Sequence, residues 1–258
     1  MPIILRSQRE IEKLREAGSV VANVLSKLKE YAKPGFSTAE LDEIALDMTR
    51  QAGGIALFKG VPCPYMNKPF PGGICASVNE QLVHGIPSRK VVLAEGDILS
   101  VDFGVKLNGY CGDSAITVGI GNIAPDRQRL LDTTQRLLDI AIEKMAPGVR
   151  WSLIARFMED TARQAGFSIV RDYVGHGIGT DMHEDPKVPN FVSSELLKDD
   201  IVLKKGMILA VEPMVNMGKA GVRTLSDGWT VVTKDRKCSA HFEHTIAVVS
   251  DGCEVLTA

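Results

Sequence analysis

Apolar residues recur at helical spacing in four segments of the chain and form short or alternating runs elsewhere. The pattern predicts helices over residues 7–33, 37–53, 125–147 and 152–164. The capping boxes Ser7-x-x-Glu10 and Ser37-x-x-Glu40 mark the starts of the first two helices. Residues 55–118 and the C-terminal stretch are predicted to form short strands and loops. Helices followed by strands, twice over, are typical of an α+β fold.

The second half of the chain repeats the first in residues as well as in element order. The tetrapeptide RQAG at 50–53 recurs at 163–166, and VLAEGDILSVDFGV at 92–105 matches VLKKGMILAVEPMV at 202–215. Seven of these last 14 positions are identical, whereas average composition gives about one or two. We therefore predict two homologous halves, about 1–120 and 121–258, related by a pseudo-twofold axis within a single domain spanning 1–258.

Composition and charge exclude several classes of function. With 45% hydrophobic residues among 258, the chain can bury a sizeable core and is not disordered. A net charge of -2 predicts no broad basic surface, and hence no direct nucleic-acid readout. The longest uncharged stretch, 114–125, is too short for a membrane helix, and the N-terminal apolar run is too short for a signal peptide. Five cysteines without CxxC spacing favour a reduced, cytoplasmic protein.

The duplication points to two acidic residues inside apolar strands. Asp102 and Glu212 occupy equivalent positions of the repeat, and neither strand core carries a lysine or arginine that could pair with them. A carboxylate in a buried strand costs several kcal/mol unless it is paired. Two symmetry-related carboxylates also repel each other, so we expect a cation between them.

A hairpin predicted over 98–118 adds a third carboxylate, that of Asp113. If residues 107–108 form the centre of the turn, Asp102 lies directly opposite Asp113. If residues 108–109 form it, Asp102 faces Ala115 and Asp113 is a diagonal neighbour. Either register leaves the two aspartates on one face, because a slip of two residues preserves the face.

The second half contributes two further candidates. Segments 227–232 and 241–246 are predicted to be later strands of the same sheet, and they add Glu243. The sequence GHGIG presents His176 among three glycines, where little bulk blocks access. Four carboxylates carry a charge of -4, which two divalent ions neutralise, and carboxylates with an imidazole suit Mn, Fe(II), Co or Zn. A two-metal hydrolase is therefore predicted, with a salt-bridged core or a different ion as the alternatives.

These candidates, in this order, resemble the ligand set of the pita-bread metallopeptidases. The segments SVNEQLVHGIP at 77–87, DGWTVVTKDRKCSAHFEHT at 227–245 and REIEKLREAG at 9–18 resemble type I methionine aminopeptidases in particular. The resemblance covers essentially the whole chain and is greatest to the minimal bacterial form, because there is no long insertion between His176 and Glu212. It implies an α+β pita-bread fold, with pseudo-symmetric halves around a central antiparallel sheet.

The resemblance also implies an activity. A single catalytic domain would remove the initiator methionine from nascent polypeptides when the second residue is small, acting as a cytoplasmic monomer, with the ribosome near the exit tunnel as a further partner. Asp113 and Glu243 would bridge two metal ions, Asp102 would complete one ion, and His176 with Glu212 would complete the other.

Further roles follow from the same resemblance. Glu212 would also carry protons during the reaction. His183 would bind the scissile carbonyl or its oxyanion, and His84 would contact the peptide nitrogen or the second residue. The implied pocket for the methionine side chain has six residues: Cys75, Met182, Trp229, Cys63, Tyr65 and Phe70. Met182 stands where the family has an aromatic residue, and the segment 63–75 is about one residue longer than usual.

Two other functions remain open at this stage. One is a pita-bread peptidase of another specificity, such as one that cleaves X-Pro dipeptides. The other is a non-catalytic pita-bread module that binds peptides or a ribosomal surface. Such modules typically lack metal ligands, whereas all five expected ligands are present here.

Overall fold

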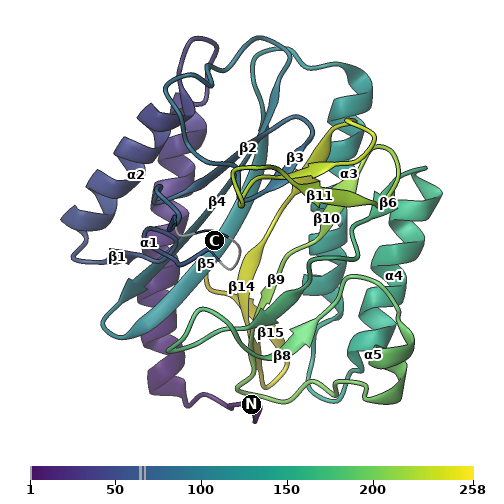
Figure 1. The fold of residues 1–258 in the computed structure, drawn as a ribbon. Helices are drawn as coiled ribbons and strands as arrows, with labels where there is room; N and C mark the ends of the chain where they lie inside the picture. The colour runs from purple at the N-terminus through teal and green to yellow at the C-terminus, as the bar shows by residue number, and fades with distance from the viewer. Residues whose placement is uncertain (1, 64–65, 67) are drawn as a thin grey trace.

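The computed structural model describes residues 2–63, 66 and 68–258, and Figure 1 shows its fold. The helices in this part of the chain are α1 (Gln8–Tyr31), α2 (Thr38–Gln51), α3 (Pro125–Lys144), α4 (Trp151–Gln164) and α5 (Ser194–Lys198). The first four lie where the apolar spacing predicts them. The short helix α5 was not predicted. It begins where the Ser193 hydroxyl accepts a hydrogen bond from the Leu196 N–H, at 3.1 Å.

The described strands are short except for one long hairpin. In the first half they are β1 (Ile55–Ala56), β2 (Cys75–Val78), β3 (Gln81–Val83), β4 (Ile98–Leu107) and β5 (Tyr110–Gly119). In the second half they are β6 (Ser168–Ile169), β7 (Gly175–Gly177), β8 (Glu184–Val188), β9 (Ile208–Val211), β10 (Met214–Asn216), β11 (Val222–Thr224), β12 (Val231–Thr233), β13 (Ser239–His241), β14 (His244–Val249) and β15 (Gly252–Val255).

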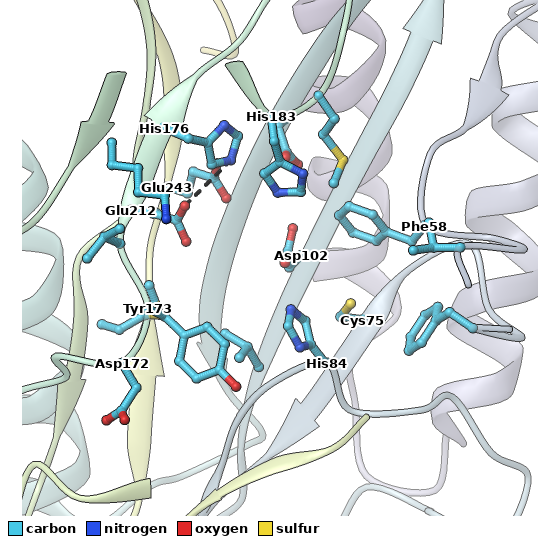
Figure 2. Close-up of a pocket in the computed structure, with 18 of the residues that line it drawn as sticks. Phe58, Cys75, His84, Asp102, Asp172, Tyr173, His176, His183, Glu212 and Glu243 are labelled. Atoms are coloured by element: carbon cyan, nitrogen blue, oxygen red, sulfur yellow. Dashed lines mark ion pairs between the residues drawn. The ribbon is translucent and has the colours of Figure 1, made fainter. Parts of the chain in front are cut away.

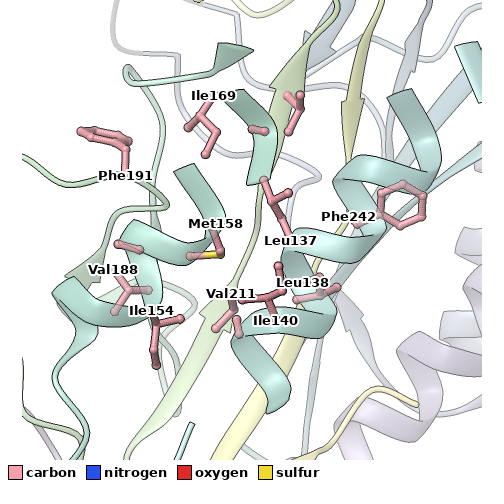
Figure 3. Packing of buried hydrophobic residues seen from close by; sticks show 14 of the residues in the cluster. Leu137, Leu138, Ile140, Ile154, Met158, Ile169, Val188, Phe191, Val211 and Phe242 are labelled. Carbon is pink, nitrogen blue, oxygen red and sulfur yellow. The ribbon is translucent and has the colours of Figure 1, made fainter. Parts of the chain in front are cut away.

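The two halves place equivalent helices on opposite sides of the central strands (Figure 1). Apolar residues of α1, such as Val21 and Leu28, are buried in a first core with Phe103 of β4. A second core joins α3 and α4 to strand β9 and its neighbours, and Figure 3 shows Leu137, Met158 and other residues packed in it. Each half therefore builds its own core, and the central strands lie between the two.

Backbone contacts repeat with the offsets of the sequence repeat. Just before α2, Ser37 forms an antiparallel bridge with Val92, and just before α4, Arg150 forms the equivalent bridge with Val202. Further backbone bonds repeat in the same way: Gly35 N–H to the Leu93 carbonyl at 2.9 Å, and Gly148 N–H to the Leu203 carbonyl at 2.8 Å. The α+β fold with pseudo-symmetric halves is thus confirmed in its details.

The hairpin of β4 and β5 has the second of the two registers considered above. Asn108 and Gly109 are the central turn residues, with φ angles of 50° and 85°, as a type I′ turn requires. Asp102 therefore pairs with Ala115, and Asp113 pairs with Gly104. Both aspartates lie on one face of the hairpin, as predicted from either register.

The second half forms a five-stranded antiparallel sheet in the order β15-β14-β9-β7-β8. An antiparallel bridge between Ala115 and Glu243 joins this sheet to the hairpin of the first half. The prediction that 227–232 belongs to the same sheet was wrong. Strand β12 instead pairs with β11 and β3 in a separate three-stranded sheet, because alternation in the sequence predicts a strand but not its partner.

Among the described helices, none is long and apolar enough to cross a bilayer.

Candidate metal centre

The predicted acids and histidines gather around one cavity of about 560 Å³ between the two halves. Figure 2 shows Asp102, His176, Glu212 and Glu243 directed towards a common centre, with His84 and His183 beside it. Asp113 also lines this cavity. The fold thus brings together all five residues that the sequence singled out as metal ligands, from strands up to 141 residues apart in the chain.

Asp102 and Asp113 are held rigidly by the hairpin. Asp102 lies mid-strand, with Cys75 of β2 on one side and Ala115 of β5 on the other. The backbone N–H of Asp113 donates to the Thr245 hydroxyl at 3.1 Å, and that hydroxyl donates to the Asp113 carbonyl at 2.8 Å. These bonds tie the aspartate strand to β14, which follows Glu243.

Glu243 is fixed by the bridge between the halves. Its backbone N–H donates to the Ala115 carbonyl at 2.9 Å, and its own carbonyl accepts from the Ser114 hydroxyl. The residue is only 2% exposed, and Asp113 is 4% exposed. The first half therefore positions the backbone of a carboxylate that belongs to the second half.

Glu212 and His176 come from neighbouring strands of the second half. Glu212 follows the end of β9 and precedes Pro213, and its backbone carbonyl accepts from Asn190 Nδ2 at 3.0 Å. His176 Nε2 lies 3.6 Å from Glu212 Oε1. The other ring nitrogen, Nδ1, is 2.9 Å from the Gly177 carbonyl. With hydrogen on Nδ1, Nε2 presents a lone pair to the cavity.

Burial and mutual repulsion make the charged forms of these acids unfavourable. Burial raises the pKa of the Asp113 carboxyl to about 7. Burial, and then the neighbouring Asp113 charge, raise the pKa of Asp102 well above its ordinary value. The pKa values of Glu212 and Glu243 are raised well above normal by burial and by the other carboxylates. A cation bound among these carboxyl groups would instead favour their charged forms and lower their pKa values.

The arrangement fits divalent metal ions. Oδ1 of Asp102, Oδ1 of Asp113 and Oε1 of Glu243 are buried, and no described group donates a hydrogen bond to them. Ligand atoms of Asp113, His176 and Glu243 all lie within 4.8 Å of one another. Carboxylate oxygens with an imidazole nitrogen are a donor set for Mn, Fe, Co or Zn. Divalent metal bound at this site would supply the partners that these buried oxygens lack.

His84 and His183 lie beside the carboxylates, as the sequence predicted. The His183 ring lies 4.4 Å from that of His176, centroid to centroid, and the His84 ring lies 5.7 Å from Tyr173. His84 has a φ angle of 57°, a left-handed conformation that costs energy outside glycine and is typical of functional sites. Burial lowers the pKa of His84 to about 4, so its ring is neutral at pH 7.

An apolar compartment adjoins the acids on the side of the first half. Phe70, Cys75, Met182 and Trp229 line the cavity, as predicted, and the rings of Phe70 and Trp229 are 5.2 Å apart. Phe58 also lines the cavity, and the sequence analysis missed it. It follows the two-residue strand β1, which is too short to show a pattern.

The other two predicted pocket residues differ from these. Cys63 is not among the described residues that line the cavity, and its place in the pocket stays a prediction. Its Sγ lies 3.5 Å from the Gly228 carbonyl, one residue before Trp229, so it contacts the segment that carries this wall of the pocket. Tyr65 lies outside the described residues.

A buried ion pair supports the loop that carries His183. Arg6 Nη2 donates to both oxygens of Glu184, at 2.6 and 2.7 Å, and the two side chains are 6% and 9% exposed. Glu184 also accepts from the Thr180 N–H at 2.9 Å. The absence of a side chain at Gly179 leaves the space that Arg6 occupies, since a Cβ there would lie 2.1 Å from Nη2.

One further titratable residue of the site was missed. His241, at the end of β13, is 1% exposed, and its Nε2 lies 3.6 Å from Glu212 Oε2 and 3.8 Å from Glu243 Oε2. The signal in the sequence was its spacing of two from Glu243, which predicts a common face on a strand.

Comparison with known proteins agrees with this geometry. A family model, metallopeptidase family M24, matches residues 12–250. The chain is 48% identical over 255 residues to methionine aminopeptidase 1 of Bacillus subtilis, covering 99% of each chain. It is 40% identical over 258 residues to the methionine aminopeptidase of Escherichia coli K12, covering 94% of that protein.

Solved structures give the same result. The methionine aminopeptidase of Thermotoga maritima superposes with a TM-score of 0.93, at 38% identity and 99% coverage of both chains. A prolidase from Pyrococcus furiosus, 19% identical, superposes with a TM-score of 0.75 over 65% of its length and shares the fold alone.

The chain belongs to metallopeptidase family M24, and its fold is that of the pita-bread metallopeptidases. Within the family its relatives along the whole length are bacterial methionine aminopeptidases, which confirms the predicted resemblance to the type I enzymes. The family and these relatives also confirm the prediction of a metal-dependent peptidase.

Proposed function

We propose that this chain removes an N-terminal methionine from nascent polypeptides whose second residue is small. The observation that carries the proposal is the single cavity that joins a buried carboxylate cluster to an apolar compartment. The carboxylates supply a metal centre for peptide hydrolysis, and the compartment accepts one unbranched apolar side chain at the end of a chain. The identity to methionine aminopeptidases over the full length supports the same reaction.

The metal centre holds two divalent ions in this proposal. Four carboxylates converge there, and in the part of the chain that the structure describes their ion pairs are with histidines, not with lysine or arginine. Two ions balance the resulting charge of four, whereas one leaves half of it buried. Asp113 and Glu243 would be ligands of both ions, Asp102 would be a further ligand of one, and His176 with Glu212 would be further ligands of the other. We propose Mn, Fe(II), Co or Zn as the metals.

Bound divalent ions would lower the pKa of a water molecule and polarise the scissile carbonyl. The side chains of the site supply the remaining functions. Glu212 accepts a proton and delivers it to the leaving nitrogen, since its carboxyl group lines the cavity beside the carboxylate cluster. His183 donates to the carbonyl oxygen as negative charge develops on it, and neutral His84 donates to the peptide backbone.

The apolar compartment determines which N-terminal residue binds. Phe58, Phe70 and Trp229 provide aromatic walls, and Cys75 and Met182 provide sulfur atoms. A thioether is polarisable and favours contact with aromatic rings and sulfur. The pocket is therefore suited to methionine, and the methionine at 182 in place of an aromatic ring leaves it adaptable.

The test is one assay on metal-free protein reloaded separately with Mn, Fe(II), Co or Zn. Each sample is offered Met-Gly-Met-Met, Met-Leu-Met-Met and Ala-Pro. We expect metal-dependent release of methionine from the first peptide, and little from the second. Cleavage of Ala-Pro alone would move the chain to the proline-specific peptidases, and full metal loading without any cleavage would favour a binding module.

We also propose that the chain acts in the cytoplasm, as a monomer, next to the ribosome. The described cysteines are all free, which suits a reducing compartment. Exposed basic side chains lie on the segment around β11 and β12 that leads to Trp229, and they suit ribosomal RNA: Lys219, Arg223, Lys234, Arg236 and Lys237. Salt-dependent co-sedimentation with ribosomes, and a sedimentation-velocity mass of one chain, are the expected results.

A further inference from the structure

His241 is a buried imidazole whose two ring nitrogens have no hydrogen-bond partner among the described residues. Neither Nδ1 nor Nε2 forms a hydrogen bond with a described residue, although the side chain is only 2% exposed. Buried polar nitrogens without partners are costly, and native proteins tolerate few of them. The ring therefore calls for an explanation of its own, beyond the five ligands and the two histidines that face substrate.

The position of His241 places it behind the carboxylates rather than in the cavity. Glu212 and Glu243 line the cavity, whereas His241 is absent from the lining among the described residues. Its Nε2 faces the Oε2 atoms of both glutamates, at 3.6 and 3.8 Å. Glu212 is thus placed between two imidazoles, with Oε1 towards His176 and Oε2 towards His241.

The two imidazoles differ at their far nitrogens. His176 Nδ1 lies 2.9 Å from the Gly177 carbonyl, which fixes hydrogen on Nδ1 and leaves Nε2 as a lone-pair donor for metal. His241 Nδ1 has no acceptor in the described structure. A buried N–H without an acceptor is unfavourable, so hydrogen on His241 belongs on Nε2, where two carboxylate oxygens are available to accept it.

We propose that His241 is a positioning residue whose Nε2–H donates to Glu212 Oε2, leaving Glu212 Oε1 to act with His176 on the metal. The inference rests on the proposed function, since it concerns the glutamate that carries protons there. A small rotation of either side chain brings the 3.6 Å separation into hydrogen-bond range. The rival role, a further metal ligand in a cluster with Glu212 and Glu243, requires hydrogen on Nδ1, which has no acceptor.

The two roles are separated by replacing His241 with glutamine and with leucine. Glutamine keeps an N–H donor of similar reach, and leucine fills similar space without one. His244→Gln is a matched control, because that ring lies outside the cavity lining and its Nδ1 is 2.9 Å from the Thr257 hydroxyl. Each protein is measured for Co(II) and Mn(II) affinity by titration calorimetry, for the Co(II) absorption spectrum, and for kcat and KM on Met-Gly-Met-Met.

For His241→Leu we expect kcat to fall by about 10- to 100-fold, as loss of a partner that orients a ligand typically causes. The KM is expected to change by less than about 2-fold, since His241 does not reach substrate. His241→Gln restores most of kcat, and the Co(II) spectrum retains its shape in both variants.

Two results would overturn the proposal. Loss of metal affinity in His241→Gln as large as in His241→Leu, with an altered Co(II) spectrum, would make His241 a ligand. Unchanged kcat and metal affinity in His241→Leu would leave it no role. If the parent protein binds metal but cleaves no methionyl peptide, the proposed function fails separately, and the effect of the two variants on metal affinity still tests the hydrogen bond.

Discussion

Asp102 and Glu212 occupy equivalent positions of the internal repeat, yet the two halves hold them differently. Asp102 lies in the middle of a ten-residue strand and is paired on both sides, with Cys75 and Ala115. Glu212 lies just past a four-residue strand and next to Pro213, which has no N–H to continue the ladder.

The difference separates the roles of the two acids. A short side chain on a paired strand has little freedom and suits a fixed metal ligand. A longer side chain beyond the end of a strand can rotate, and Glu212 faces an imidazole on either side. The duplication therefore places two carboxylates in equivalent positions, and the end of the second strand before Glu212 suits the proton transfer that we propose for that residue.

The largest effect is expected for Asp102→Asn, which removes the proposed anionic ligand that β4 holds in place. Metal affinity should fall by more than the roughly 10- to 100-fold typical of an outer partner, and activity should be lost with it. Calorimetry on the metal-free protein measures the affinity. An Asp102→Asn protein that binds both ions as before would end the assignment of Asp102 as a fixed ligand.

Glu212→Gln tests the carboxylate that lies past the end of β9. The amide keeps the length of the side chain but cannot accept and release a proton, so kcat should fall by about 10²- to 10⁴-fold. More metal binding should persist than in Asp102→Asn, because His176 remains for the ion that Glu212 serves, whereas Asp102 is the one terminal ligand proposed for its ion. Metal content and single-turnover rates on Met-Gly-Met-Met are compared between the variants. An equal loss of metal in Glu212→Gln and Asp102→Asn would contradict the different roles assigned to the two carboxylates.

Trp229→Ala sharpens the comparison by leaving both acids untouched. The wall opposite Phe70 is lost, so kcat/KM for methionyl peptides should fall by about 10- to 100-fold through weaker binding of the side chain. Metal affinity should equal that of the parent protein. If kcat/KM is unaffected, Trp229 does not contact the methionine side chain.

The smallest effect concerns stability without metal. Burial raises the pKa of Asp113 from 3.8 to about 7 in the folded chain. The neutral form is favoured on folding, so its contribution to stability is complete below pH 3.8 and is lost as the pH rises through 7. Metal-free Asp113→Asn should therefore melt a few degrees above the parent protein at pH 8, at about 2–4 °C per kcal/mol, and lose this advantage near pH 4.

Calorimetric scans at both pH values measure this difference. Added metal should reverse the order at pH 8, because it stabilises only the protein that keeps the carboxylate. The same melting difference at pH 4 and pH 8 would show that Asp113 is not forced towards its neutral form.

The sequence predicted those features that depend on local patterns or on the repeat. Capping boxes and apolar spacing placed α1 and α2, and the repeat singled out Asp102 and Glu212. The hairpin register remained open, because two neighbouring turns were both compatible with the residues. The face shared by Asp102 and Asp113 could still be predicted, since it does not depend on that choice.

Features that depend on distant contacts escaped the sequence analysis. Strand β12 pairs with β3 as well as with β11, and nothing in the alternation of residues 231–233 specifies β3 as a partner. His241 was overlooked although its spacing of two from Glu243 was visible, because that spacing does not reveal that the ring is buried 3.6 Å from Glu212. Phe58 enters the pocket only because the first half folds it there.

The ion pair between Arg6 and Glu184 has a consequence for synthesis, because 178 residues separate its members. Arg6 emerges among the first residues of the growing chain, and its carboxylate partner emerges only when almost half of the second half has been made. Until then the only one of its two carboxylate partners that has been made is Glu10, whose Oε1 lies 3.4 Å from Arg6 Nη1, and the loop of His183 lacks its ion pair. The loop of His183 is thus fixed by an ion pair between the first residues made and a residue of the second half, and the carboxylates of Glu212 and Glu243 are added only after that pair can form.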